Sequence, residues 1–380
     1  MDQLQQARAQ IDEIDAQMAA LFEERMQAVA AVAQYKAATG KAVFDPAREA
    51  AVLDRNTARL RDGALRPYYR AFLQQAMDVS SAYQRAVLGC GTAAYQGVEG
   101  AWAQIALRRI FPFANARAYT TWADVFAAVA AGDAQYGVLP FENSNAGDVS
   151  AVLDLLYAHP ELAVTQMYDL PIRQDLLGLP GASLGQIKTV VSHQQALAQS
   201  SPFLKMHSLA TRAWNNTADA ARYVAEQKDP TLAAIASAET ARLYGLEILA
   251  EGINEDGDNT TRFIVVEKAD AAARTPRAND RLALLFTVDH KPGKLAGVIQ
   301  EIGSQGFNME CIKSRPLPHV PFEYYFYVQL VCPAAAPDGA CRQLTAALDA
   351  MCRTVRRLGV FALGGPAAEK GVCHHEKIGQ

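Results

Sequence analysis

The sequence lacks long hydrophobic runs and blocks of basic residues, and both absences narrow the possible functions. No stretch approaches the roughly 18 consecutive apolar residues that a membrane span requires. The formal net charge is -4 with acidic and basic residues interspersed, so nothing indicates binding to nucleic acid or to a membrane surface. These features predict a soluble cytoplasmic protein that holds small anionic ligands with individual arginines.

The sequence also lacks cysteines at the spacing of a metal site. Its six cysteines include no Cys-x-x-Cys pair and no zinc-ligand spacing, so we expect reduced thiols and no metal site. Cys373, His374 and His375 could bind a metal, but they lie in a tail, 366–380, that follows a Gly-Gly-Pro break. A disordered tail is the expected structure there.

Residues 4–38 contain neither glycine nor proline and repeat apolar residues at helical spacing. The pattern predicts one helix of about 50 Å. Asp45-Pro46 is typical of a helix start and predicts a second helix that runs to about Arg61. Pro67 begins a third predicted helix, which ends near Leu88. We therefore expect an all-helical module over residues 1–89.

The pattern changes after residue 91, and the 380 residues are enough for two or three domains. Short apolar runs alternate with helical segments from 90 to 268, which predicts an α/β module. An Ala-, Arg- and Asp-rich connector follows over 269–280. The order strand, helix, strand, strand, helix, strand over 279–365 then predicts a ferredoxin-like α+β module.

Cations interrupt the apolar seam of the first helix. Arg25 occupies a seam position and Lys36 lies about three turns later, so each needs an anion, either a bound ligand or a carboxylate of a neighbouring helix. The second and third helices add further polar groups, namely Asp45, Arg48, Glu49, Ser80 and Gln84.

This set of polar groups resembles the helical chorismate mutases that precede prephenate dehydratase in fused bacterial enzymes, over residues 4–88. The resemblance implies rearrangement of the dianion chorismate to prephenate, which needs charge complementarity and no cofactor. It implies that Arg25 holds a carboxylate, that Lys36 and Gln84 donate to the ether oxygen, and that Glu49 accepts the substrate hydroxyl. Substrate contacts are also implied for Arg8, Asp45, Arg48 and Ser80.

Arg8 lies 17 positions before Arg25, or about 25 Å along a straight helix. It cannot reach the site of its own chain. If it contacts substrate, it does so in a partner chain, which predicts an intertwined antiparallel homodimer. The alternative is an arginine exposed on the helix surface.

Separated motifs in the α/β module resemble those of prephenate dehydratases. They are Tyr95–Gly100, Pro140–Ser144 with Gly147, Ser192–Gln195 with Gln199, Asn216-Thr217 and Thr260–Phe263. The resemblance implies two α/β lobes around a cleft, similar to periplasmic ligand-binding proteins. The implied reaction expels the C4 hydroxyl of prephenate with loss of carbon dioxide and gives phenylpyruvate.

The resemblance makes Thr261 the residue most closely tied to this activity and Arg262 a carboxylate anchor, while Glu142, Ser192, Gln199 and Thr217 shape the pocket. Glu142 ends an apolar strand, where it is either a protonated donor to the leaving group or an acceptor that orients the substrate. Structural alternatives are a helix cap for Ser192, a strand position for Thr261 and an ion pair for Arg262.

One turn departs from the family pattern, because Ala101 and Ala103 stand where hydroxyl residues are usual. Arogenate, which has an amino group in place of the keto oxygen, is therefore a second candidate substrate.

The C-terminal module resembles the ACT regulatory domain through Gly293–Ala296 and Lys313–Pro316. The resemblance implies that L-phenylalanine binds between the modules of two chains, in contact with Gly293, Leu295, Ser314, Arg315 and Pro316. Lys294 and Lys313 replace the usual alanine and glutamate, and a plain dimerisation domain is the alternative.

Together these features predict a bifunctional enzyme of phenylalanine biosynthesis, inhibited by L-phenylalanine and at least dimeric. Two other hypotheses stay open at this point. In the first, the chain is a mutase whose middle module prefers arogenate or relays a phenylalanine signal. In the second, the α/β and C-terminal modules form a non-catalytic amino-acid sensor.

Overall fold

The computed structural model describes residues 2–39, 46–88, 91–274, 280–333 and 337–364. It divides into two compact units, residues 1–92 with 113–115, and residues 93–112 with 116–380, which are described separately. Among the described residues, no helix is long and apolar enough to cross a membrane. Cys373, His374 and His375 lie outside the described residues.

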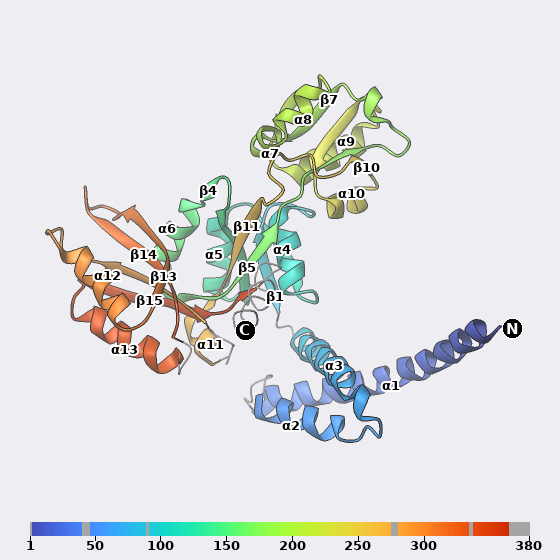
Figure 1. The fold of residues 1–380 in the computed structure, drawn as a ribbon, viewed down its shortest axis with the longest axis horizontal. Helices are drawn as coiled ribbons and strands as arrows, with labels where there is room; N and C mark the ends of the chain where they lie inside the picture. The colour runs from blue at the N-terminus through green and yellow to red at the C-terminus, as the bar shows by residue number, and fades with distance from the viewer. Residues whose placement is uncertain (1, 40–45, 89–90, 275–279, 334–336, 365–380) are drawn as a thin grey trace, which may run out of the picture. The chain divides into compact units, whose positions relative to one another are not determined.

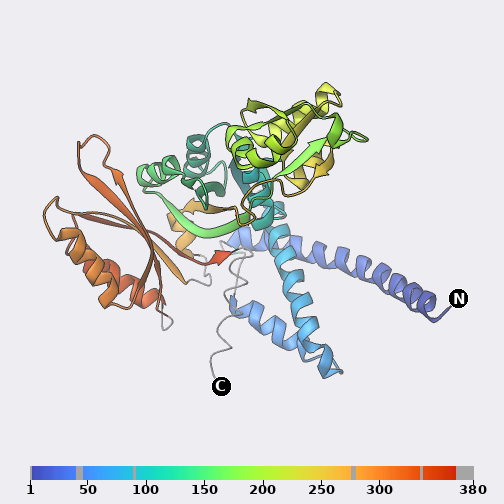
Figure 2. The same ribbon diagram turned by 45° about the horizontal axis from the view of Figure 1, so that its top comes forward.

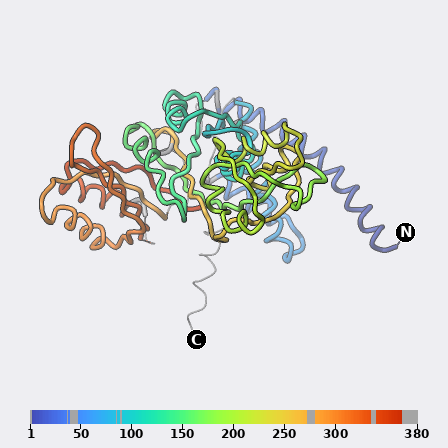
Figure 3. The backbone as a smooth tube through the Cα atoms, turned by 90° about the horizontal axis from the view of Figure 1, so that it is seen from above, coloured from blue at the N-terminus to red at the C-terminus, as the bar shows by residue number. Residues whose placement is uncertain are grey.

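The first unit is helical (Figures 1 and 3). The structure confirms one long N-terminal helix and two further helices, namely α1 (Gln3–Thr39), α2 (Pro46–Thr57), the 3-10 turn η1 (Gly63–Leu65) and α3 (Arg66–Val87). Helix α2 ends earlier than expected. Asp62 instead caps η1 by accepting a hydrogen bond from the backbone N–H of Ala64 at 2.9 Å.

Helix α1 packs against α3 only along its second half. Met26 and Ala33 are buried, whereas Leu4, Ile11, Ile14 and Met18 are 57, 56, 48 and 42% exposed. These exposed residues follow one another at intervals of seven, three and four residues, a spacing typical of a helix that packs along another helix. The first half of α1 therefore presents an apolar stripe without a described neighbour.

The second unit begins with a lobe built on a seven-stranded sheet of order β16-β5-β11-β3-β1-β2, with β4 paired to β3. Its strands are β1 (Thr92–Gln96), β2 (Asn115–Tyr119), β3 (Tyr136–Asn143), β4 (Gly147–Asp148), β5 (Leu162–Pro171), β11 (Thr260–Lys268) and β16 (Leu363–Gly364). Its helices are α4 (Trp102–Ile110), α5 (Trp122–Ala131) and α6 (Ser150–Ala158).

The second lobe has a five-stranded sheet of order β10-β6-β9-β7-β8. Its elements are β6 (Asp175–Gly178), η2 (Leu184–Gln186), β7 (Thr189–His193), α7 (Gln194–Gln199), α8 (Ser201–Met206), β8 (Ala210–Trp214), α9 (Thr217–Gln227), β9 (Leu232–Ala236), α10 (Ala238–Tyr244) and β10 (Glu247–Ala250). The chain enters this lobe after β5 and returns before β11. The two crossing segments pair through a hydrogen bond from Ile172 N to Asn259 O of 2.7 Å. A two-lobed α/β arrangement was the expected fold.

The connector expected over 269–280 begins with a helix, α11 (Ala269–Arg274). The elements that follow have the expected order, namely β12 (Arg281–Thr287), α12 (Lys294–Ser304), β13 (Asn308–Pro316), β14 (Tyr324–Val331), α13 (Pro337–Asp349) and β15 (Thr354–Phe361). The strands form an antiparallel sheet of order β13-β14-β12-β15, and α12 and α13 cover one face (Figure 2). This is the ferredoxin-like topology.

The other face of this four-stranded sheet shares a hydrophobic core with the first lobe. Leu285, Tyr325 and Tyr327 of the sheet pack in one cluster with Leu156 and Met167 of the lobe. After β15, the chain adds β16 in parallel to the edge strand β5. The C-terminal module is therefore built onto the first lobe.

Gly359 marks the closest approach between these parts, because a Cβ there would overlap the backbone of Val164 on β5. We expect Gly359→Ala to lower the free energy of unfolding by about 1–3 kcal/mol through overpacking. Gly303→Ala is the matched control, since that helical position has open space around it and alanine favours helix by up to ~1 kcal/mol. Thermal unfolding of both variants measures this, and a Gly359→Ala protein as stable as the wild type would contradict it.

Candidate active sites

The helical unit brings three of the predicted mutase residues together between α1 and α3. Arg25 Nη1 donates to the carbonyl of Ala76 at 3.1 Å and also to Ser80 Oγ. Ser80 and Gln84, one turn apart on α3, are 5 and 8% exposed. Gln84 Oε1 is buried without a hydrogen-bond partner among the described residues. Neutral groups thus hold Arg25, and in the described part of the chain no carboxylate pairs with it.

The other predicted mutase residues differ in exposure. Lys36 and Glu49 are half-buried and Arg48 is exposed, while Asp45 lies outside the described residues. Arg8 is exposed near the start of α1, and the single unbroken helix keeps it about 25 Å from Arg25.

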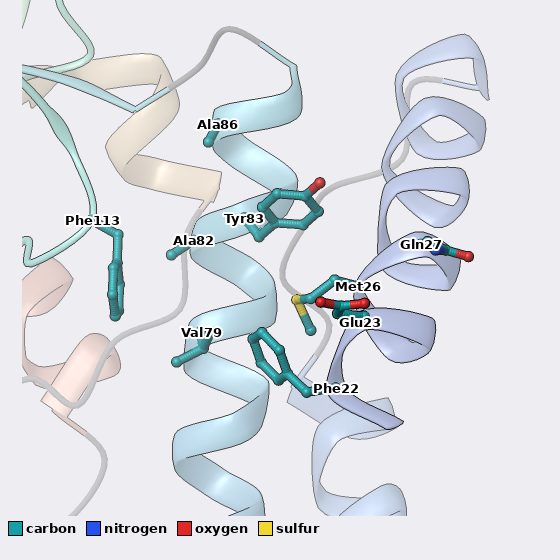
Figure 4. Close-up of a pocket in the computed structure, with 9 residues that line it drawn as sticks. All are labelled: Phe22, Glu23, Met26, Gln27, Val79, Ala82, Tyr83, Ala86 and Phe113. Carbon is teal, nitrogen blue, oxygen red and sulfur yellow. The ribbon is translucent and has the colours of Figure 1, made fainter. Parts of the chain in front are cut away.

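An apolar pocket of about 450 Å³ is lined by residues of α1 and α3 (Figure 4). Phe22 and Met26 come from α1, and Val79 and Tyr83 come from α3. None of the predicted mutase residues lines it. Such walls do not suit a dianion, so this pocket is not the mutase site.

The two lobes of the second unit enclose a cavity of about 940 Å³. Three predicted dehydratase residues line it, Thr261 from the first lobe and Gln199 and Thr217 from the second. Ala101 and Ala103 line it as well, so the departure from the family pattern lies in the cavity wall. We call this cavity the cleft.

A network of side-chain hydrogen bonds connects four residues that line the cleft. Asn143 Nδ2 donates to Thr261 Oγ1 at 2.9 Å and to Asn259 Oδ1 at 2.8 Å. Asn259 Nδ2 in turn donates to Gln199 Oε1 at 3.2 Å. The network links the first lobe to the second through the crossing segment, and buried networks of this kind hold their members in one geometry.

The orientation of Asn143 fixes the role of the Thr261 hydroxyl. Asn143 Oδ1 accepts from the backbone N–H groups of Asn145 and Ala146 at 3.1 and 2.9 Å, so its amide nitrogen must be the atom that faces Thr261. Thr261 Oγ1 therefore accepts a hydrogen bond from the protein. Its own proton remains available to donate into the cleft.

Two helices begin at the cleft and supply positive potential there. Asn216 caps α9 by accepting from Asp219 N at 2.7 Å, and Asn216 and Thr217 line the cleft. Helix α4 starts after Gly97–Gly100, where Gly100 has a φ of 86°. Helix N-termini attract anions, which suits the carboxylates of a small organic acid.

Three predicted dehydratase residues do not line the cleft. Ser192 is fully buried and donates to the carbonyl of Ile235 at 2.7 Å. Arg262 makes a bidentate pair with Asp169 at 2.7 and 2.8 Å, and this pair raises the pKa of Arg262. Thr261 and Phe263 line the cleft, and side chains alternate along a strand, so Arg262 faces the other side.

Glu142 faces away from the cleft because β3 has a β-bulge next to it. The register of β3 against β11 passes from Phe263↔Pro140 to Arg262↔Glu142, which makes Phe141 the extra residue. Pro140 and Asn143 line the cleft, and Glu142 turns to the C-terminal module, where it pairs with Lys313 at 3.2 Å. In a regular strand Glu142 would share the side of Pro140.

The predicted effector residues lie at two places within one chain. Gly293, with a φ of 79°, is the N-cap residue of α12, and Leu295 lines a cavity of about 540 Å³ with Tyr324 and Phe326. Arg315 instead pairs with Asp154 of α6 at 3.0 and 2.6 Å. Hydrogen bonds from Arg315 lower the pKa of Asp154. Ser314 and Pro316 flank Arg315 on β13 and, like it, do not line that cavity.

Sequence reasoning assigned no role in the cleft to Asn143 or Asn259, and it noted Lys313 only as a replacement in the C-terminal module. The sequence could have indicated Asn143, because asparagine is uncommon in strands and this residue ends β3 within the Pro140–Ser144 motif.

Two separate regions of the chain match known protein families. The chorismate mutase type II family matches residues 7–85, and the prephenate dehydratase family matches residues 93–271. The bifunctional chorismate mutase/prephenate dehydratase of Neisseria gonorrhoeae is 34% identical over 85% of this chain and 87% of that protein. The chain belongs to this bifunctional family. As a member of the family, it is an enzyme with a chorismate mutase region and a prephenate dehydratase region.

Two further proteins similar to this chain are dehydratases by name. Arogenate dehydratase 2 of Petunia hybrida is 35% identical over 59% of this chain and 56% of that protein. The crystal structure of prephenate dehydratase from Arthrobacter aurescens in complex with L-Phe superimposes with a TM-score of 0.63 at 28% identity. That match covers 71% of this chain and 89% of the other.

Proposed function

We propose that residues 1–89 convert chorismate to prephenate, that residues 90–268 convert prephenate to phenylpyruvate, and that residues 279–365 bind L-phenylalanine and inhibit the enzyme. The observation that carries the dehydratase assignment is the Asn143–Thr261 hydrogen bond, in which Thr261 Oγ1 accepts, so that its own proton is available for donation in the cleft. The buried Arg25–Ser80–Gln84 group supports the mutase assignment.

The mutase reaction needs electrostatic stabilisation and no nucleophile. Chorismate is a dianion, and its ether oxygen gains negative charge as the C–O bond breaks. Arg25 would hold one carboxylate, and Lys36 and Gln84 would donate to the ether oxygen. Asp45, Arg48, Glu49 and Ser80 would complete the contacts around the ring.

The apolar stripe on α1 supports a homodimer in which each chain completes the site of its partner. Leu4, Ile11 and Ile14 are exposed on the same helix segment as Arg8. If a partner chain packs on this stripe, Arg8 of one chain can reach the site around Arg25 of the other chain. Arg8 is too far from Arg25 of its own chain to act there. The second carboxylate of chorismate would then be held by the partner chain.

The dehydratase step breaks two bonds. The ring carboxylate leaves as carbon dioxide, the electron pair of that C–C bond enters the ring, and the C4–O bond breaks with its pair on oxygen. The departing hydroxide takes a proton and leaves as water. Donation from Thr261 to this oxygen would stabilise the charge that develops on it, while the N-termini of α4 and α9 would hold the carboxylates. Gln199 and Thr217 would position the ring.

Arogenate is a second candidate substrate for the cleft, favoured by Ala101 and Ala103 in its wall. Comparison of kcat/KM for prephenate and arogenate decides between them. A higher value for prephenate supports the main proposal, and a tenfold preference for arogenate overturns it in favour of an arogenate dehydratase.

Phenylalanine sensing is supported by the L-Phe complex of the Arthrobacter relative and by the cavity beside the Gly293 turn, which Leu295, Tyr324 and Phe326 line together with charged residues. Calorimetric titration of the full chain with L-phenylalanine, together with dehydratase assays, tests it. Binding with loss of dehydratase activity is expected, whereas binding without any prephenate turnover would favour a relay or a non-catalytic sensor. No heat of binding would leave the module with a dimerising role.

A further inference from the structure

A buried lysine connects the C-terminal module to the dehydratase region. Lys313 of β13 is 8% exposed, and its Nζ lies 3.2 Å from Glu142 Oε1 and also pairs with Asp148. The ammonium lies 4.9 Å from the centroid of the Phe141 ring. A buried cation between two carboxylates is stable only while both partners hold their positions.

The two carboxylates belong to one hairpin. β3 and β4 pair Glu142 with Asp148 and Asn143 with Gly147, so the carboxylates face each other directly across the strands. Like charges in directly opposed positions destabilise a strand pair, and Lys313 offsets this repulsion. We refer to residues 140–149 as the cleft hairpin.

Other charged groups nearby do not replace Lys313. Arg262 is engaged by Asp169 through two hydrogen bonds. Burial raises the pKa of the Cys311 thiol to about 11, so this neighbour stays neutral near pH 7. Glu310 pairs with Arg281 at 2.9 Å. The ammonium of Lys313 is thus the cation that the described structure offers to the pair.

Part of the cleft hairpin lines the cleft. Asn143, Ala146, Gly147 and Asp148 line the cavity, and Asn143 directs the Thr261 hydroxyl. The hairpin therefore joins the Lys313 ion pairs, one of which is made by Asp148 in the cleft wall, to the Asn143 amide.

We propose that Lys313 is a positioning residue for the dehydratase reaction, because its ammonium neutralises Glu142 and Asp148 and fixes the hairpin that directs Thr261. This inference rests on the proposed role of Thr261. It assigns Glu142 to an ion pair that shapes the cleft and extends the dehydratase machinery into the C-terminal module.

Lys313→Met tests the proposal, because methionine keeps most of the side-chain volume and removes the charge. Dehydratase kcat is expected to fall on the order of 10- to 100-fold, since displacement of a reacting group by about 1 Å costs up to 10²-fold. KM should change less than kcat. Mutase activity of the same chain is the internal control, and Lys205→Met, at an exposed lysine of α8, is the matched control variant.

A second substitution separates an electrostatic role from a chemical one. Adding Glu142→Gln to Lys313→Met removes the repulsion and should restore most of the lost kcat. If Glu142→Gln alone lowers kcat as much as loss of the Thr261 hydroxyl, and the double variant shows no recovery, Glu142 acts chemically and the proposal is wrong. An unchanged kcat in Lys313→Met also overturns it, as does an equal loss of mutase activity.

Amide hydrogen exchange of residues 140–149 distinguishes failure of this inference from failure of the proposed function. Faster exchange in Lys313→Met is expected. If the wild type does not turn over prephenate, the proposed function fails and the positioning role fails with it, while faster exchange would still show the ion-pair link. If exchange and kcat both match the wild type, this inference alone fails.

Discussion

Replacing Thr261 by valine is expected to lower dehydratase kcat about 100- to 1,000-fold, the usual effect of removing one donor from a developing oxyanion. Valine keeps the shape of threonine and removes only the hydroxyl. Asn143 then loses the acceptor that it contacts at 2.9 Å, but its bond to Asn259 remains. Steady-state kinetics with prephenate measure the effect, and mutase turnover of chorismate by the same chain should be unchanged.

Thr261→Ser is the matched control, because it keeps the donor and loses only a methyl group. It should retain kcat within about tenfold, since the hydroxyl supplies the larger effect. A valine variant as active as the serine variant would show that Thr261 only shapes the cleft. Loss of both activities in the valine variant would indicate a folding defect.

Arg8→Ala and Arg25→Ala should each lower chorismate turnover at least about 100-fold, because each removes charge that holds the dianion in the transition state. The two variants should complement each other when they share a dimer. A heterodimer of the two has one site with both arginines and one with neither, so it should show about half the wild-type mutase activity.

Co-expression of the two variants with different affinity tags, followed by tandem purification, isolates this heterodimer. Dehydratase activity with added prephenate is the control for folding. Heterodimers as inactive as the parent variants would mean that the arginines act within one chain, or that Arg8 does not contact substrate. A fully active Arg8→Ala homodimer would assign Arg8 to the exposed surface of the helix.

Much of the fold could be predicted because its local signals agree with its tertiary structure. The absence of glycine and proline over residues 4–38 predicts α1, and the apolar runs of the C-terminal module fall in the ferredoxin-like order. Helix α11 was not predicted, because its alanines occur among charged residues typical of a connector. The two-residue strand β16 could not be predicted, since only its pairing with β5 defines it.

The sequence correctly predicted those cleft residues whose place in the fold follows from their motif alone. Thr261, Gln199 and Thr217 line the cleft as expected. Ser192, Arg262 and Glu142 do not line it. Arg262 follows Thr261 in a strand, so alternation places it on the opposite side, whereas the side on which Glu142 lies depends on register. The bulge at Phe141 turns Glu142 away from the cleft and toward Lys313, and a bulge is set by pairing between strands that are distant in sequence.

The most direct test of the central claim is a single end-point assay with chorismate as the sole substrate. The purified chain is incubated with chorismate, with and without L-phenylalanine, and the products are separated and identified. Phenylpyruvate should form without L-phenylalanine and decrease when L-phenylalanine is present. Accumulation of prephenate with no phenylpyruvate would contradict the dehydratase assignment, and unchanged chorismate would contradict the mutase assignment.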